Sequence, residues 1–506
     1  MVDEQQLSPL PQAKRGLALR YFLPLREAIV RPIAALRLRY APLLLVYFSY
    51  GALGLIDVSR DLWVKERLSL SPAELAGIGV WLALPWTIKM VFGQMVDSIP
   101  LFGSQRRVYL VAGALFTAAG LLTLAGAAGG WLTFMPTASL YVLGSILVVL
   151  GTVIQDVVAD AISTEVVNRT DAQGAPRDET EVRAELGMVQ VLGRLALSAG
   201  IVAVAGLSGW IASVLSREHV FLVALVVPAL SLIAAFTASE REAERRPLDL
   251  RILIGGIAFG SAVVAIGLLG VPFGQEIIFI VSMVVVCVML AIVTQDVPSA
   301  TRRAIFFTAI IIFAFRATPA VGDGYFWWTI DVLKFDESFY GVLRQTAAVI
   351  SVMVLWLFSK QLTEYSVTAV LFWLTVLGAV LSLPNVGLYY GLHHWTEAHL
   401  GFGARSIALV DAATSSPFAQ LSMVPLLALI AFYAPEGRRA TWFALMASLM
   451  NLALVAGQLF TKYLNHYFVV GRGEYSELGA LLICVVAAGF VIPIAAIALL
   501  GRKIVR

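Results

Sequence analysis

Long apolar runs recur along the 506 residues of this chain, separated by short polar stretches. An α-helix rises 1.5 Å per residue, so a run of about twenty apolar residues spans the ~30 Å hydrocarbon core of a bilayer. The alternation of apolar and polar residues that a membrane β-strand needs is absent, so helices must satisfy the backbone inside the membrane. We therefore predict an all-α membrane protein with about fourteen transmembrane helices, at residues 41–62, 72–97, 108–129, 137–166, 182–208, 219–239, 251–271, 276–294, 303–330, 338–359, 364–388, 405–433, 438–466 and 477–500.

The composition agrees with this prediction. Hydrophobic residues make up 59% of the chain and charged residues 14%, whereas soluble domains contain ~25% charged residues. The two cysteines, Cys287 and Cys484, both fall within apolar runs, so neither a disulfide framework nor a thiolate metal site is indicated. No glycine loop with a lysine for binding phosphates is present. We predict no enzyme activity, no cofactor and no metal.

Basic residues gather at the ends of the predicted helices that lie on one side of the membrane. By the positive-inside rule this side is cytoplasmic, so we expect both termini in the cytoplasm and the protein in the cell (inner) membrane. Residues 1–40 intersperse arginines with apolar residues, which predicts an amphipathic segment on the inner leaflet without a cleavable signal. The basic residues are Lys14, Arg15, Arg20, Arg26, Arg31, Arg37, Arg39, Arg106, Arg107, Arg245, Arg246, Arg302, Arg303, Arg438, Arg439, Arg502 and Lys503.

Two short segments recur at matching positions in the two halves of the chain. Arg194–Gly200 is similar to Asn451–Gly457. Leu70–Leu75 corresponds to Phe335–Tyr340, and both of these segments lie at the start of a predicted helix. Chance similarity is the alternative, but the matching positions favour an internal repeat, as in transporters with a solute site between the repeats. The predicted parts are a cytoplasmic segment 1–40, a six-helix bundle 41–239, a linker 240–300 with two additional transmembrane helices, and a six-helix bundle 301–506.

The predicted loop after residue 97 has features of a gate. Gly93 is expected to let neighbouring helices approach closely, and Asp97, at a helix end, can hold the basic pair Arg106 and Arg107 in one conformation. This spacing resembles the loop between the second and third helices of the major facilitator superfamily. A charged loop that only fixes the topology is the alternative.

Further motifs resemble one branch of that superfamily, the folate/biopterin transporters. The resemblance covers about residues 45 to 460 and implies two six-helix bundles plus two extra helices. It also implies a secondary transporter that moves a folate- or pterin-like organic anion by alternating access. The motifs are Leu84–Lys89, Val96–Gly103, Asp156–Asp160, Thr318–Asp323, Met423–Pro425, Pro435–Gly437 and Ala440–Asn451.

Two alternative functions stay open. Gln155–Glu165 also resembles the corresponding stretch of bacterial muropeptide permeases, which are similar to this chain in having two helices between their halves. A permease for muropeptides or other sugar conjugates is therefore one alternative. A membrane assembly or sensor protein that keeps the fold without a solute path is the other.

Charged residues within the apolar runs are the candidates for a solute site, because an unpaired charge there costs at least ~2.5 kcal/mol. Arginine binds carboxylates through two parallel hydrogen bonds, which suits an anionic solute. The alternative is that these charges pair only with one another. The candidates are Asp57, Lys89, Arg194, Arg316, Asp323 and Arg344.

Asp156 and Asp160 are candidates for carrying a proton, together with Asp323. Four residues separate the first two, so both lie on one face of a helix, and paired carboxylates in a membrane suit proton carriage. Pairing with Arg183 and Arg194 is the alternative. The expected partners are an anionic solute, protons and the lipid bilayer, with no nucleic acid, and the protein is expected to be a monomer.

The predicted helix at 303–330 is expected to be broken. Pro319 lacks a backbone donor, and Gly322 and Gly324 adopt conformations that other residues avoid. Unwound backbone in a membrane must line a cavity or be covered by protein, so this helix is the best single candidate for the site. The aromatic residues that follow could stack a flat heterocycle or anchor the helix at the interface, and they are Tyr325, Trp327 and Trp328.

Overall fold

The computed structural model describes residues 34–104, 106–171, 173–238, 250–295, 297–364, 367–421 and 439–501. Several of the predictions above therefore lie outside the described residues. They concern residues 1–33, the linker arginines Arg245 and Arg246, the motifs Met423–Pro425 and Pro435–Gly437, the side chain of Arg183, and Arg438, Arg502 and Lys503.

Over the described residues the protein is helical, as predicted. The elements before the linker are η1 (Leu38–Tyr40), α2 (Ala41–Ala52), η2 (Leu53–Ile56), α3 (Asp57–Arg67), α4 (Pro72–Thr87), α5 (Lys89–Ser98), α6 (Arg107–Gly129), α7 (Thr137–Glu165), α8 (Glu179–Val214), α9 (Arg217–Val223) and α10 (Val226–Thr237). The later elements are α11 (Leu250–Leu268), α12 (Gly274–Val293), α13 (Ser299–Arg316), α14 (Asp323–Asp331), α15 (Glu337–Glu364), α16 (Val367–Tyr389), α17 (Leu392–Leu400), α18 (Ala404–Leu421), α20 (Arg439–Tyr467) and α21 (Leu478–Leu500).

Helices fall within all of the predicted transmembrane ranges. Within the described ranges, 10 helical stretches are long and apolar enough to cross a membrane by length and composition. A multi-pass, all-α membrane protein is therefore confirmed, while the exact number of spans stays a prediction.

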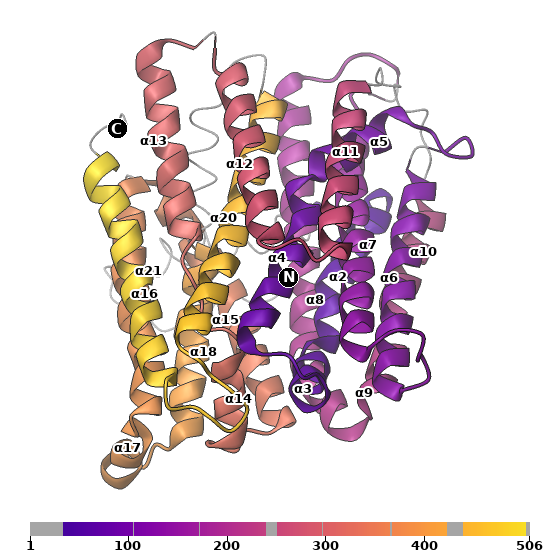
Figure 1. Ribbon diagram of the computed structural model, residues 1–506. Coiled ribbons are helices and arrows are strands. Elements are labelled where there is room, and N and C mark those ends of the chain that lie inside the picture. Colours follow the sequence, from indigo (N-terminus) through magenta and orange to yellow (C-terminus); the bar gives the residue numbers. More distant parts are fainter. Residues whose placement is uncertain are drawn as a thin grey trace, which may run out of the picture.

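The helices run lengthwise through the molecule and define its two ends (Figure 1). We call the end with α3, α9, α14 and α17 the α3 end, and the opposite end, where α5 and the starts of α11 and α13 lie, the α5 end. Residues 34–238, the N-terminal part, lie beside residues 297–501, the C-terminal part. The two parts pack against each other through α8 on α15 and α4 on α20.

The repeated segments Leu70–Leu75 and Phe335–Tyr340 begin helices in the same way. Ser71 accepts a hydrogen bond from the backbone N–H of Glu74 at 3.2 Å and caps α4. Asp336 accepts one from the backbone N–H of Phe339 at 2.8 Å, at the start of α15. Such side chains satisfy backbone donors that the first turn of a helix leaves free.

The glycines that end the other repeated segments also make matching contacts. A Cβ added at Gly200 of α8 would lie 2.2 Å from the carbonyl oxygen of Phe48 in α2. A Cβ added at Gly457 of α20 would lie 3.0 Å from the carbonyl oxygen of Thr318, just after α13. In both places a backbone passes too closely for a larger side chain.

The predicted break in the helix at 303–330 is confirmed. Helix α13 ends at Arg316 and α14 begins at Asp323, with Gly322 at φ 81° between them. The freed backbone is partly satisfied by α20, because the N–H of Ala320 donates to Thr461 at 2.9 Å and Asn465 donates to the carbonyl of Val321 at 3.0 Å. The corresponding first helix of the N-terminal part is interrupted too, by η2 between α2 and α3.

Candidate transport site and gates

Lys89 joins the two carboxylates that the sequence placed on one helix face. Its Nζ donates to Asp156 Oδ2 at 2.5 Å and to Asp160 Oδ2 at 2.6 Å, and Tyr47 donates to Asp160 Oδ1 at 3.0 Å. Arg194 is exposed and forms no hydrogen bond with either carboxylate among the described residues, but its charge acts on Asp156, so the alternative that Arg194 balances these carboxylates stays a prediction. One ammonium therefore binds two carboxylates directly.

Lys89 holds this position because the polypeptide leaves the helical conformation just before it. Ile88 separates α4 from α5, with φ −103° and ψ 19°. The carbonyl oxygens around this break accept hydrogen bonds from α20, from Asn451 to Trp86 at 3.0 Å and from Ser448 to Thr87 at 3.3 Å. The Lys89 cluster, consisting of Lys89, Asp156, Asp160 and Tyr47, thus lies next to the contact between the two parts.

An aromatic pair borders the same cluster. The rings of Tyr50 and Trp86 are stacked, with centroids 5.9 Å apart and an interplanar angle of 21°. The cluster is open on one side, since the side chain of Asp160 is 52% exposed and that of Asp156 14%. A flat ring with an attached anion would find stacking surface, a cation and hydrogen-bond acceptors here.

The aromatic residues predicted to stack a heterocycle are not available for it. Trp327 and Trp328 are only 1% and 4% exposed and belong to the hydrophobic core. Tyr325 stacks on Trp328 and donates to Asn385 Oδ1 at 2.8 Å.

Asp323 lines a cavity of about 290 Å³ whose other lining residues all belong to the N-terminal part. Arg60 and Asp61 of α3 line the same cavity, with Tyr141 and Ser145 of α7. Asp323 begins α14, directly after the break that the sequence predicted. Arg60 and Asp61 were not among the sequence candidates, although their place one helical turn after Asp57 could have suggested them.

Asp57 and Arg344, both predicted to bind solute, are partners of each other in this structure. Arg344 Nη1 lies 2.8 Å from Asp57 Oδ2, and its Nη2 lies 2.9 Å from Asp61 Oδ2. Arg60 binds the same two carboxylates, at 3.1 and 2.9 Å. Because Arg344 belongs to the C-terminal part and both aspartates to the N-terminal part, this pair holds the two parts together.

Other ion pairs at the α3 end also join the two parts. Lys65 lies 2.5 Å from Asp331, and Arg217 lies 3.1 Å from Glu337. Arg472 donates to the carbonyl oxygens of Val64 and Leu68 at the end of α3. We call Asp57, Asp61, Lys65, Arg217, Asp331, Glu337, Arg344 and Arg472 the α3-end latch.

Asp323, Asp160, Arg316 and Arg194 lie in different surroundings in the described part of the chain. Asp323 lies in the cavity near α3, whereas Asp160 lies in the Lys89 cluster toward the α5 end. Arg316 is half-buried at the last turn of α13, and Arg194 is exposed on α8. Sequence spacing gives depth along a helix but not the direction of a side chain around the bundle.

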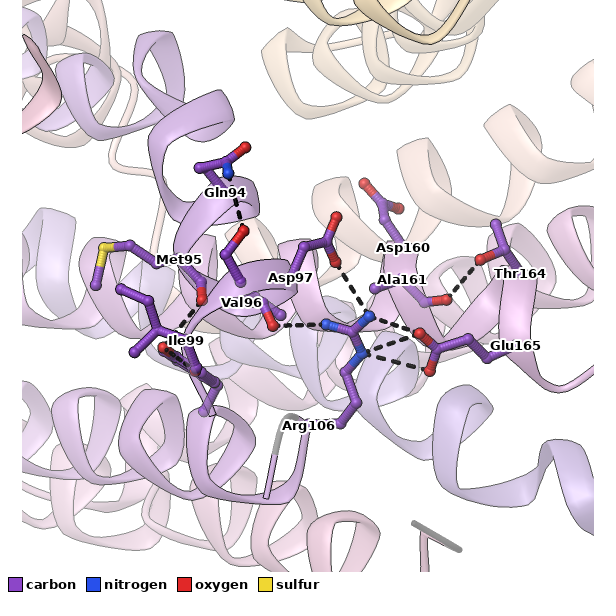
Figure 2. Close-up of polar contacts among 12 residues, drawn as sticks. Gln94, Met95, Val96, Asp97, Ile99, Arg106, Asp160, Ala161, Thr164 and Glu165 are labelled. Atoms are coloured by element: carbon purple, nitrogen blue, oxygen red, sulfur yellow. Dashed lines mark hydrogen bonds and ion pairs between the residues drawn. The ribbon is translucent and has the colours of Figure 1, made fainter. Parts of the chain in front are cut away.

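The predicted gate at the α5 end is built on Arg106 (Figure 2). Arg106 lies 3.0 Å from Asp97 Oδ1 and 2.5 Å from Glu165 Oε1, and its Nη1 donates to the carbonyl of Val96 at 2.9 Å. Burial opposes its charge, but the hydrogen bonds and charges of Glu165 and Asp97 outweigh this and raise the pKa of Arg106. The loop is thereby tied to both α5 and α7.

One prediction about this gate needs correction. Gly93 is not a point of close helix approach, because an added Cβ would meet no described atom within 4 Å. Arg107 donates to the carbonyl oxygens of Ala235 and Ala238 near the end of α10, and its contact with Asp97 stays a prediction. The sequence analysis did not include Glu165 in the gate, because its partner Arg106 lies in a loop distant in sequence.

The chain is similar to known transporters along most of its length. The BT1 family matches residues 51–505. A folate-biopterin transporter from Synechocystis sp. (strain ATCC 27184 / PCC 6803 / Kazusa) is 28% identical over 461 residues, covering 90% of this chain and 81% of that protein. A probable folate-biopterin transporter 4 of Arabidopsis thaliana is 23% identical, covering 86% of this chain and 89% of the relative. A putative folate transporter 2 of Plasmodium berghei is 22% identical, covering 87% of this chain and 83% of the relative.

Solved structures with the same fold are also transporters. A POT family transporter in complex with a thioalcohol-conjugated peptide superimposes with a TM-score of 0.67 at 14% identity, covering 94% of this chain and 100% of the other. A mutant of the nucleoside transporter NupG gives a TM-score of 0.62 at 11% identity, covering 91% of this chain and 99% of the other. At these identities the likeness concerns the fold alone.

Proposed function

The chain belongs to the BT1 family, the folate-biopterin transporters, and on this premise we propose that it moves a folate- or pterin-like organic anion across a membrane. At the coarser level it is a multi-pass membrane transporter and belongs to no enzyme family. The observation that carries the proposal is the family match over residues 51–505, combined with a cation and a stacked aromatic pair beside an open cluster.

We assign the solute to the Lys89 cluster and its surroundings. The flat pterin ring stacks beside Tyr50 and Trp86, whose rings already lie nearly parallel. Arg194, whose guanidinium forms no hydrogen bond among the described residues, and Lys89 bind carboxylates of the solute. Arg316 and Asp323 are proposed to meet the solute later in the cycle, when the cavity near α3 opens.

The solute is proposed to move by alternating access between two six-helix bundles, residues 41–239 and 301–506. The matching caps at Ser71 and Asp336 and the matching contacts of Gly200 and Gly457 support this division. The α3-end latch closes one end while Asp160 is exposed toward the other. The two linker helices bring the proposed number of spans to fourteen, with both termini cytoplasmic and the protein in the inner membrane.

Protons are the proposed coupling ion. Lys89 contributes one positive charge to two carboxylates, so one negative charge remains within the hydrogen-bonded group. A proton on Asp156 or Asp160 removes this charge, which a membrane interior disfavours. With the cluster neutral, the charge of Arg194, which acts on Asp156, then offsets one negative charge of the entering solute.

Uptake into proteoliposomes tests the proposal. Purified wild-type protein should accumulate labelled folate or biopterin, faster with an imposed pH gradient. Lys89→Met should lower uptake about tenfold or more, since a charged hydrogen bond to the solute is lost. Lys334→Met, at an exposed lysine of the loop before α15, should transport like the wild type.

Three results would count against the proposal. Absence of folate and biopterin uptake by the wild type would reject the solute class, and uptake of a muropeptide instead would favour the alternative permease. Equal uptake by Lys89→Met and wild type would reject the assigned site. Uptake at the same rate with and without an imposed pH gradient would reject proton coupling but not the solute class or the site.

A further inference from the structure

A groove separates the end of α12 from the start of α13 at the α5 end of the molecule. Its volume is about 640 Å³. Residues of α12 form one wall, including Cys287 and Ala291, and residues of α13 form the other, including Arg302, Arg303 and Phe306. None of these residues belongs to the Lys89 cluster or to the cavity of Asp323.

The packing of the two helices explains why a groove forms between them. Helix α12 packs on α4 and α20, whereas α13 packs on α20 and α21. The two are neighbours in sequence, but each follows a different side of α20. Leu290 and Ile305 form the floor of the groove and are 8% and 2% exposed, within one hydrophobic cluster.

The groove carries two positive charges that no described residue neutralises. Arg302 and Arg303 are both exposed, and neither forms a side-chain hydrogen bond or ion pair within the described ranges. Arg106 and Arg107, at the same end, both donate to protein oxygens. The N-terminal end of α13 adds partial positive charge next to the two guanidiniums.

Apart from the hydroxyl residues Thr294 and Ser299, the rest of the groove is apolar, and it faces outward. Phe306 is 53% exposed and Cys287 is exposed, as are Ile292 and Val288 on the same helix. Helix α12 is long and apolar enough to cross the membrane, so its end lies near the headgroup region. Two arginines at the headgroup level above an apolar wall match the shape and charge of an anionic phospholipid.

We propose that this groove binds an anionic phospholipid. Its phosphate lies against Arg302 and Arg303, and an acyl chain follows the wall formed by Cys287, Ala291 and Phe306. A small free anion would use the arginines but leave the apolar wall empty, which is why the groove favours a lipid. The proposal does not depend on which solute the protein transports.

Native mass spectrometry of the full-length protein titrated with phosphatidylglycerol tests the site. Arg302→Gln/Arg303→Gln should bind phosphatidylglycerol about tenfold more weakly than the wild type, given the usual contribution of basic residues near a membrane surface. The matched control Arg67→Gln/Arg169→Gln removes two exposed arginines elsewhere and should bind like the wild type. Phosphatidylcholine should bind weakly to all of them.

Ala291→Trp distinguishes a groove from a charged surface, because it fills the apolar wall and keeps both arginines. It should also reduce binding severalfold. Unchanged binding by this variant, or equal binding by the double arginine variant and its control, would overturn the proposal.

Cys287 provides a readout at the groove itself. With Cys484 replaced by Ser, maleimide labelling of Cys287 should be slower in nanodiscs of phosphatidylglycerol than in phosphatidylcholine. The double arginine variant should lose this difference. Glycerol phosphate, which has the headgroup charge without acyl chains, should give no protection, and protection by it equal to that of the lipid would contradict a lipid site.

Discussion

Lys89 has a structural role in the Lys89 cluster, and we propose that it also has a functional one. It neutralises carboxylates of α7 at 2.5 and 2.6 Å, and it stands next to the aromatic pair Tyr50 and Trp86. Removing one partner of a buried ion pair leaves a charge without compensation, whereas removing all partners need not destabilise the fold. The two roles of Lys89 can therefore be separated experimentally.

We predict that Lys89→Met lowers the free energy of unfolding by about 1–3 kcal/mol, less than for a fully buried pair because Lys89 is partly exposed. Lys89→Met/Asp156→Asn/Asp160→Asn should recover most of this loss, since no charge is then left unpaired. Thermal unfolding of the purified protein in detergent measures both. Transport should stay low in the triple variant, so recovery of stability without transport identifies a functional role.

A different pattern would contradict this reasoning. If the triple variant is less stable than Lys89→Met, the carboxylates are stabilised by groups other than Lys89. Lys334→Met provides the control, because it removes an exposed lysine with no side-chain hydrogen bond among the described residues.

At the level of single residues, the sequence predicted polar positions better than polar partners. Asp156 and Asp160 share a face because helical periodicity places residues i and i+4 together. Their partner Lys89 depends on the bend at Ile88, which no periodicity reveals. Likewise Asp57 and Arg344 were both recognised as important, but their mutual contact joins residues 287 positions apart.

Among the elements, the start of α15 shows how a short motif fixes a helix. Asp336 accepts a hydrogen bond from the N–H of Phe339 at 2.8 Å and lies 2.6 Å from Arg405. The backbone N–H of Phe339, and then Arg405, lower the pKa of the Asp336 carboxyl. The charged form of Asp336 is thus the one that the folded protein favours.

We predict that Asp336→Ala lowers the free energy of unfolding by about 1 kcal/mol, while Asp336→Asn loses less because asparagine also caps helices. Because the folded pKa is depressed, the contribution of the charge is present above the unfolded value of ~3.9 and is lost as the pH falls through the folded value. Thermal melts at pH 7 and at a pH below the lowered pKa of Asp336 should show the difference between wild type and Asp336→Asn disappearing at low pH. A difference that persists unchanged would contradict this assignment.

Helix existence and breaks could be predicted from the sequence, whereas the packing of the extra helices could not. Pro319 and Gly322 predicted the break before α14, because proline lacks a backbone donor and glycine adopts backbone conformations that other residues avoid. Helix α12 was predicted as an additional span, but its polar contacts were not. Gln275 donates to the carbonyl of Gly77 in α4 at 3.0 Å, and Glu276 binds Lys462 of α20 at 2.8 Å. One linker helix therefore touches both parts through isolated polar residues that carry no recognisable pattern.

For the whole molecule, ion pairs at the α3 end join the N-terminal part to the C-terminal part. The contacts of Arg344, Lys65 and Arg217 with the opposite part all lie at this end. Arg405 and Asp336 also form an ion pair there, but both belong to the C-terminal part. If the two parts separate at the α3 end during transport, breaking an ion pair between the parts should favour opening. Breaking the Arg405–Asp336 pair within the C-terminal part should not.

We predict that Arg344→Gln shifts the protein toward a conformation open at the α3 end. Loss of two charged hydrogen bonds, worth roughly 1.4 kcal/mol or more in total, changes such an equilibrium about tenfold. Ser145 lines the cavity of Asp323 and is only 8% exposed, so it can report the opening. With Cys287 and Cys484 replaced by Ser, Ser145→Cys should react with a membrane-impermeant thiol reagent about ten times faster when Arg344→Gln is added. Arg405→Gln should leave the reaction rate of Ser145→Cys unchanged. If Arg344→Gln and Arg405→Gln accelerate the reaction equally, a general loss of stability exposes the cavity, and release of the contact between the two parts does not.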